Sequence, residues 1–124
     1  MNEDKFQQDA IEILDRLTLM LFEDCFVLDK TLYALPKHSG IYAVKHRSEG
    51  ILYIGKSFNI RNRFMGGHKA LFYAYADCFP ITDIRIAVVA FSYAQRSQAL
   101  ELEARMLQIA QPRYNSIIRK QKDS

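Results

Sequence analysis

The sequence predicts an α+β fold in which a small three-stranded antiparallel sheet is flanked by helices. Three observations predict it. Apolar residues recur at helical spacing near the N terminus, two short β-prone segments are joined by a polar tetrapeptide that contains glycine, and a third β-prone segment precedes another amphipathic stretch. The 124 residues, 49% hydrophobic and 25% charged, are enough for one globular domain with its own core.

The first predicted element is an amphipathic helix over residues 4–23. Its apolar positions lie mostly three or four apart with acidic residues on the opposite face, and they are Phe6, Ala10, Ile13, Leu14, Leu17, Met20 and Leu21. Pro36 and the polar residues after it separate this helix from the rest of the chain. We therefore expect an acidic helical extension over 1–34 and a second unit over 35–124. The helix either packs on the core or contacts another chain, a partner protein or a second copy in a homodimer.

Charge differs sharply between these two parts. Residues 1–34 hold eight acidic and three basic side chains, whereas residues 35–124 hold six acidic and 14 basic ones. A basic body attracts polyanions because neutralised phosphates release their counterions, although the same charge also serves solubility. No apolar run approaches the roughly 18 residues of a membrane span, and the acidic start is unlike a secretory signal. With Cys25 and Cys78 far apart, we expect reduced thiols in a cytoplasmic protein without membrane contact.

A β-hairpin is predicted next, with strands over 40–46 and 51–55 and a turn over 47–50. An even-length turn at this place pairs Tyr42 with Gly55 and Val44 with Tyr53. Tyr42 and Tyr53 then lie diagonally on the same face of the sheet. Two phenols on one face form either part of the core or a functional pair.

A basic segment follows the hairpin. Asn59 is expected to cap a short helix over 60–65, which Gly66 and Gly67 interrupt before a second helix over 68–76. Three cationic residues stand close together just past a glycine-bearing strand end: Lys56, Arg61 and Arg63. Such a strand-to-helix turn favours phosphate binding, and the alternative is a solvated basic helix.

The last predicted elements are a central strand over 83–91 and a helix from Ser97 to Gln111 that stops at Pro112. The basic tail from residue 118 is expected to fray. Glu103 lies inside the apolar arc of this helix, and a carboxylate on the buried side needs a cation or a metal. A structural ion pair is one reading. The other is a single-carboxylate anchor for Mg²⁺ or Mn²⁺, because Mg²⁺ keeps most of its waters.

Several segments of the chain resemble one known family. Gly40-Ile41-Tyr42 followed by Tyr53-Ile54-Gly55 resembles the two tripeptides that name the GIY-YIG nucleases. Further elements follow in the family's order and spacing, namely Lys56 directly after the second tripeptide, Arg63 ten residues after Tyr53, Leu102-Glu103, and Pro112-Arg113-Tyr114-Asn115. The resemblance covers about residues 35–116, and it is greatest to the domain that opens a bacterial excision-repair subunit.

The resemblance implies a metal-dependent endonuclease that hydrolyses phosphodiester bonds in DNA, with RNA a less expected substrate. Glu103 would hold one divalent ion, Mg²⁺ or Mn²⁺. Tyr42 would act as general base, with Lys56 favouring its phenolate. Arg63 would bind the scissile phosphate and Tyr53 would position it. The alternatives are a nucleic-acid-binding module that does not cut and a nuclease subunit of a larger complex.

Four residues are expected to contact the substrate or orient its neighbours: Lys56, Arg61, His68 and Asn115. The sequence departs from the family pattern at one of them. Some members have a histidine four residues after the arginine, where Gly67 stands here, and His68 comes one residue later. His68 is therefore either a displaced member of the site or an ordinary surface residue.

Overall fold

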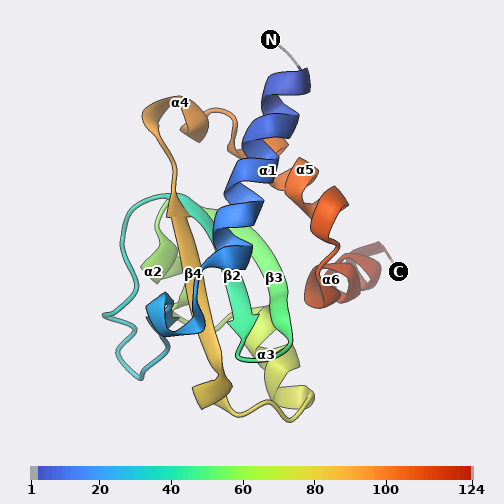
Figure 1. Ribbon diagram of the computed structural model, residues 1–124. Helices are drawn as coiled ribbons and strands as arrows, with labels where there is room; N and C mark the ends of the chain where they lie inside the picture. The colour runs from blue at the N-terminus through green and yellow to red at the C-terminus, as the bar shows by residue number, and fades with distance from the viewer. Residues whose placement is uncertain (1–2, 124) are drawn as a thin grey trace.

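The computed structural model describes residues 3–123, with the side chains of residues 5–119 (Figure 1). It contains helices, two 3₁₀ turns and four strands in the order α1 (Glu3–Leu19), η1 (Phe22–Asp24), β1 (Phe26–Val27), β2 (Gly40–His46), β3 (Gly50–Ser57), α2 (Ile60–Phe64), α3 (Lys69–Ala76), η2 (Ile81–Asp83), β4 (Ile84–Ala90), α4 (Tyr93–Arg96), α5 (Ala99–Ala110) and α6 (Arg113–Asp123). The predicted α+β class is confirmed. Within these residues no helix has the length and apolar character needed to cross a bilayer.

The sheet has the strand order β1-β4-β2-β3, and every neighbouring pair is antiparallel. The prediction of three strands is wrong by one, because β1 adds a fourth. It has two residues, and it pairs Phe26 with Ile86 and Val27 with Arg85. A strand this short carries no alternating pattern that sequence could reveal. The predicted central position of β4 is confirmed.

The hairpin has the predicted pairing at the positions that matter for the site. Tyr42 lies opposite Gly55 and Val44 lies opposite Tyr53. The register then shifts by one residue between Val44 and Lys45, as in a β-bulge. Gly50 adopts a positive φ of 82° at the end of the turn, a conformation that favours glycine.

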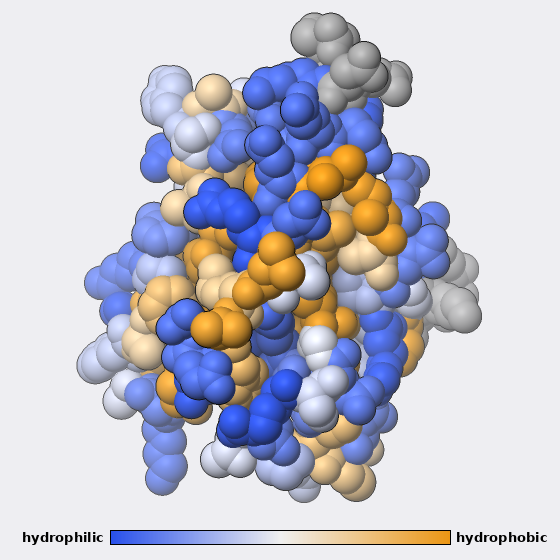
Figure 2. Space-filling model, viewed as in Figure 1, coloured by the Kyte–Doolittle hydropathy of each residue, from blue (hydrophilic) through white to orange (hydrophobic). Residues whose placement is uncertain are grey.

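Each face of the sheet has its own hydrophobic core. On one face α1 and α5 pack against Ile41, Ala43, Ala87 and Val89. On the other face α2, α3 and α6 pack around Tyr42, Val44, Ile84 and Ile86. Figure 1 shows α1 lying across the front of the sheet, with α5 and α6 beside the β3 edge. Hydrophilic residues dominate the surface of the face shown in Figure 2, and apolar patches flank α1.

Helix α1 ends at Leu19, earlier than the predicted residue 23, where a buried lysine meets it. Lys45 is 7% exposed, and its ammonium donates to the main-chain oxygens of Leu17, Thr18 and Met20 at 2.9, 3.1 and 2.7 Å. A cation is favourable at this end because the last carbonyls of a helix have no partner and carry partial negative charge. One face of α1 thus packs on the core, while the boundary at residue 34 stays a prediction.

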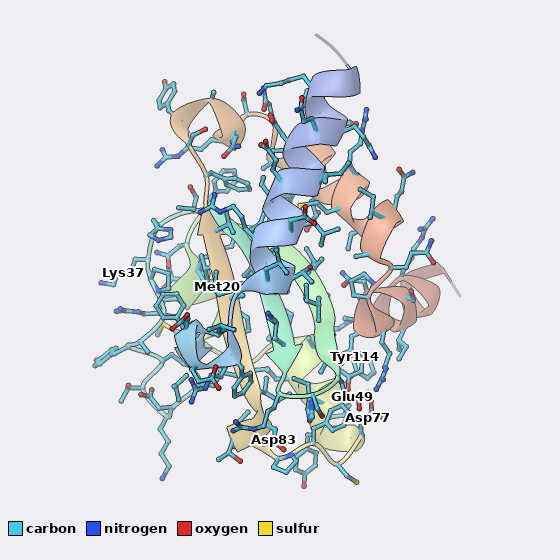
Figure 3. The ribbon with its side chains drawn as sticks, in the orientation of Figure 1. Met20, Lys37, Glu49, Asp77, Asp83 and Tyr114 are labelled. Atoms are coloured by element: carbon cyan, nitrogen blue, oxygen red, sulfur yellow. The ribbon has the colours of Figure 1, made fainter. Side chains whose placement is uncertain are left out.

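The C-terminal segment differs from its prediction. Ser92 caps the short helix α4, and α5 begins at Ala99 instead of Ser97. Pro112 ends one helix but does not prevent the next, because α6 continues to Asp123 where fraying was expected. The buried Tyr114 anchors α6 by donating its hydroxyl to Asp77 at 2.6 Å. Figure 3 shows Tyr114 close to Asp77 and Glu49, both of which pair with Arg113.

Candidate active site

The two glycines of the signature tripeptides are required by close packing. A Cβ atom on Gly55 would lie 2.5 Å from the hydroxyl oxygen of Tyr42, so the phenol reaches across β3 only because no side chain stands there. A Cβ atom on Gly40 would lie 2.5 Å from the carbonyl oxygen of Val89 on β4. Gly55 therefore sets where the Tyr42 hydroxyl lies, and Gly40 allows the close approach of β2 to β4.

Tyr42 and Tyr53 share one face of the sheet, as predicted. Their ring centroids are 6.1 Å apart, and the ring of Phe64 meets Tyr42 edge-on at 5.1 Å. Tyr42 is only 1% exposed, while Tyr53 is half-buried. The pair therefore combines an inner phenol and an outer phenol at the margin of the core.

The inner phenol has a histidine partner. The hydroxyl oxygen of Tyr42 lies 2.6 Å from Nε2 of His68, which is 6% exposed. Nδ1 of His68 caps α3 by accepting the main-chain N–H of Ala70 at 3.0 Å. A nitrogen that accepts a hydrogen bond carries no proton, so the ring proton of the neutral imidazole lies on Nε2. His68 thus donates to the oxygen of Tyr42.

His68 reaches Tyr42 through the turn that joins α2 to α3. Gly66 and Gly67 both have positive φ angles, 85° and 104°. Such angles suit glycine and are rare for other residues. The histidine that stands one residue later than in the family pattern therefore belongs to the group around Tyr42, and the surface alternative is wrong.

Arg63 projects from α2, whose start is fixed by Asn59 accepting the main-chain N–H of Asn62. Its positive charge lowers the pKa of both tyrosines and of His68, and it also donates a hydrogen bond to Tyr53. Arg63 is exposed, so its guanidinium is available to an anion from solvent.

Arg61 makes a different set of contacts, although it belongs to the same helix. Its guanidinium donates to the main-chain oxygens of Leu35 and Tyr33, both at 2.9 Å, and stacks over the Tyr33 ring. These bonds hold the loop before β2. The structure does not join Arg61 to the tyrosine pair, and its expected contact with substrate stays untested.

Glu103 approaches the same site from α5, on the other side of the β3 edge. Its half-buried carboxylate accepts the main-chain N–H of Lys56, and the Lys56 ammonium is the main charge that favours its ionised form. The negative charge of Glu103 in turn raises the pKa of Tyr42 and Tyr53. Lys56 was expected to favour the Tyr42 phenolate, whereas the cation that lowers the pKa of Tyr42 is Arg63.

Asn115 binds the edge strand. Its side-chain oxygen accepts the N–H of Ile54 at 2.8 Å, and its amide nitrogen donates to the Ile54 carbonyl at 2.9 Å. The outward main-chain groups of β3 are thus bound at two alternate residues: Ile54 by Asn115 on α6 and Lys56 by Glu103 on α5. Asn115 orients Tyr53 through the residue next to it; a contact with substrate remains a prediction.

Burial dominates the electrostatics of this group. It raises the pKa of Tyr42 well above its usual value, and the neighbouring Tyr53 adds to the rise while Arg63 opposes it. Burial also raises the pKa of Tyr53 and of Glu103. Burial and then the charge of Arg63 lower the pKa of His68 to about 4, so the imidazole is neutral at pH 7.

A single divalent ion fits Glu103. One carboxylate can accept the N–H of Lys56 and still direct a second oxygen outward, in the manner of a ligand oriented by its neighbours. Over the part of the chain that the structure describes, no three histidine, cysteine or acidic side chains gather into a metal-binding group. The donor set therefore suits Mg²⁺ or Mn²⁺, which keep several waters, better than a fully protein-ligated ion.

A groove lined in part by Tyr53 and Glu103 was not predicted from the sequence. It runs between α5 and α6, and its volume is about 790 Å³. Its lining comes from two helices on either side of Pro112, and only the first of them was predicted. The regular spacing of Gln108, Gln111, Asn115 and Arg119 along the chain was the signal available in the sequence.

The site at the end of the β-hairpin combines two phenols, a guanidinium and one half-buried carboxylate. In a small α+β domain, this combination is a GIY-YIG type of site. Residues 38–116 match the family model described as the UvrC-like GIY-YIG domain. The chain belongs to this family, and its membership supports the endonuclease class that the sequence predicts.

Curated relatives are UvrABC system C proteins. The one from Prochlorococcus marinus subsp. pastoris is 30% identical over 115 residues, which cover 86% of this chain and 16% of that protein. The one from Moorella thermoacetica is 32% identical over 96 residues, with 71% and 14% covered. This chain thus spans about a sixth of the length of the relatives it matches. Among solved structures, the magnesium-bound N-terminal endonuclease domain of UvrC from Thermotoga maritima superposes with a TM-score of 0.48 at 18% identity, covering 70% of this chain and 98% of that one.

Proposed function

We propose that this chain is a metal-dependent endonuclease that hydrolyses phosphodiester bonds in DNA. One observation supports this most. Tyr53 links the components of the site: its ring lies 6.1 Å from that of Tyr42, its hydroxyl is hydrogen-bonded to Arg63, and it lines the same groove as Glu103. Phosphodiester hydrolysis needs these components, because the attacking water must lose a proton while negative charge builds on the phosphoryl oxygens.

The charged residues divide the work of holding the phosphate. Arg63 presents a planar fork of donors to a non-bridging oxygen. Glu103 would hold one Mg²⁺ or Mn²⁺, and that ion would supply positive charge for the scissile phosphate and the departing oxygen. Lys56 binds the substrate backbone and balances the charge of Glu103. Tyr53 directs its hydroxyl at the phosphate.

Tyr42 takes the proton of the attacking water at its hydroxyl oxygen. Its raised pKa means that no free phenolate persists, so the proton it already carries must leave as the new one arrives. Tyr53 is hydrogen-bonded to Tyr42 and more exposed, and it passes this proton on to solvent. The neutral His68 donates Nε2–H to the Tyr42 oxygen throughout, which stabilises negative charge there without adding a competing acid.

The test compares Glu103→Gln and Arg63→Ala with Glu101→Gln in a nicking assay with Mg²⁺ or with EDTA. Glu101 is a matched control, because it lies on the same helix but is exposed and pairs with Arg105 at 2.6 Å. We expect both site variants to fold normally and to lose at least about 100-fold in rate, the scale of losing one transition-state contact. Normal cleavage by both, or cleavage in EDTA, overturns the proposal.

A second candidate is a nuclease subunit of a larger assembly, since the relatives that this chain matches are C proteins of the UvrABC system. The same relatives suggest an incision in DNA repair, in a cytoplasmic setting that suits its two free cysteines. Contact of α1 with a partner or a second copy stays a prediction. Nicking by the isolated chain, with a size measurement by sedimentation, separates an autonomous enzyme from a subunit.

A further inference from the structure

The groove between α5 and α6 is continuous with the proposed active site. Tyr53 and Glu103 belong to its lining, and Arg119 lines it on α6. A chain of nucleotides whose scissile phosphate lies at Glu103 therefore has a neighbouring nucleotide within reach of this groove. Its volume of about 790 Å³ is ample for one nucleotide.

The lining has the chemistry of a nucleobase site. Leu107 and Ile118 are partly exposed and offer apolar surface, which suits the face of a base. Gln108 and Gln111 carry amides, which donate to and accept from the polar edge of a base. Arg119 supplies a cation for a flanking phosphate. A base inside a duplex has both faces covered by its neighbours, so only an unstacked base can use such apolar surface.

Gln111 adds an independent indication. It ends α5 in the left-handed conformation, with φ 45° and ψ 58°, where glycine is the usual residue. Among the described residues its side chain makes a single, long hydrogen bond, 3.4 Å from Nε2 to the main-chain oxygen of Gln108. Strained positions that keep a side chain cluster at binding sites. Gln111→Gly therefore removes the amide and relieves the backbone, so lost function would not come from lost folding.

We propose that this groove binds an unpaired nucleotide next to the scissile phosphate, with Gln111 and Arg119 as its polar contacts. The inference rests on the proposed nuclease function and adds a base-binding subsite to it.

The first experiment measures cleavage of three DNAs of equal sequence: a continuous duplex, a bubble and a flap. We expect the two interrupted forms to be cut at least about tenfold faster, because one stacked base contributes on the order of tenfold or more in binding. Gln111→Gly and Arg119→Ala should each reduce this ratio several-fold, while Gln8→Ala and Arg16→Ala, exposed on α1, should keep it. Equal rates on all three DNAs, or an unchanged ratio in both groove variants, overturn the inference while the nuclease function stands.

The second experiment reads the groove without cleavage. An oligonucleotide with one unpaired 2-aminopurine is titrated with the protein in EDTA, and its fluorescence reports whether the base leaves its stacked state. We expect a change that Gln111→Gly reduces and that a fully paired 2-aminopurine does not show. An identical signal from the paired and unpaired probes overturns the inference. A protein that binds the unpaired probe but cuts no DNA with any metal overturns the proposed nuclease function instead.

Discussion

The side-chain amide of Asn115 forms two hydrogen bonds with the main chain of a single residue, Ile54, at 2.8 and 2.9 Å. Ile54 belongs to the edge strand β3, so Asn115 takes the place of the next strand. The edge that would otherwise remain unpaired is thereby closed by α6. This pairing also positions Tyr53, because Tyr53 directly precedes Ile54 on β3.

Asn115→Ala should lower both stability and activity. It leaves two half-buried main-chain groups without protein partners, which costs about 1–3 kcal/mol, and it frees the strand that carries Tyr53. Urea unfolding and the nicking rate measure the two effects. A variant with unchanged unfolding midpoint and rate would show that the pairing has no role.

Lys45→Met should destabilise the attachment of α1. The ammonium makes three hydrogen bonds to the end of that helix, and charged hydrogen bonds contribute roughly 1.5–3 kcal/mol each before desolvation is counted. We expect a net loss of about 2–4 kcal/mol in the free energy of unfolding. Lys30→Met, at an exposed position, is the control and should change it by less than about 0.5 kcal/mol.

Stability should depend on pH through His68. Its pKa is lowered to about 4 in the folded state, whereas the unfolded chain has an ordinary value near 6.5. Between these values the unfolded state binds the proton and the folded state does not, so stability falls as the pH drops from about 6.5 to 4 and is constant above that window. The loss is on the order of 3 kcal/mol. Urea titrations from pH 4 to 8 should show this slope in the unsubstituted protein and not in His68→Gln. The same slope in both proteins would assign the effect to other groups.

Tyr42→Phe should lose most of the cleavage rate and keep its affinity for DNA. The hydroxyl oxygen is the proposed proton acceptor, while the ring and its contacts with Phe64 remain. Fluorescence anisotropy with a labelled flap substrate in EDTA measures affinity, and single-turnover nicking measures the rate. Equal rates for the two proteins would remove Tyr42 from the chemistry.

Gly55→Ala should disrupt the site without touching any polar group. The new Cβ atom would stand 2.5 Å from the Tyr42 oxygen and 2.6 Å from the ring carbon that bears it. The ring must move, at a cost of about 1–3 kcal/mol, and its bond to His68 is lost. We expect a lower melting temperature and a rate close to that of Tyr42→Phe. Wild-type activity in this variant would mean that the close approach is dispensable.

Local patterns predicted those parts of the molecule that depend on short-range rules. The pairing of Tyr42 with Gly55 follows from the period of a strand and an even turn, and the inward direction of Glu103 follows from helical spacing. The two-residue strand β1 has no pattern of its own, because only its pairing with β4 defines it. Helix α6 was missed because Pro112 ends one helix and leads into another.

The roles within the site were harder to predict than its members. Arg61 and Arg63 are chemically identical and two residues apart, and only the position of the loop before β2 assigns one to structure and the other to the tyrosines. The placement of His68 depends on the positive φ angles of two glycines, Gly66 and Gly67, and the spacing of residues in the sequence does not predict these angles. The pairing of Lys56 with Glu103 likewise depends on the tertiary structure, which brings β3 next to α5.

Lys45 and Tyr42 belong to the same seven-residue strand, three positions apart. One fastens the N-terminal helix, and the other lies at the centre of the proposed chemistry. A fusion protein that uses this domain should therefore include the acidic helical extension over 1–34. Truncation at residue 35 would expose one side of β2 and leave the Lys45 ammonium without its main-chain partners, on the strand that positions Tyr42.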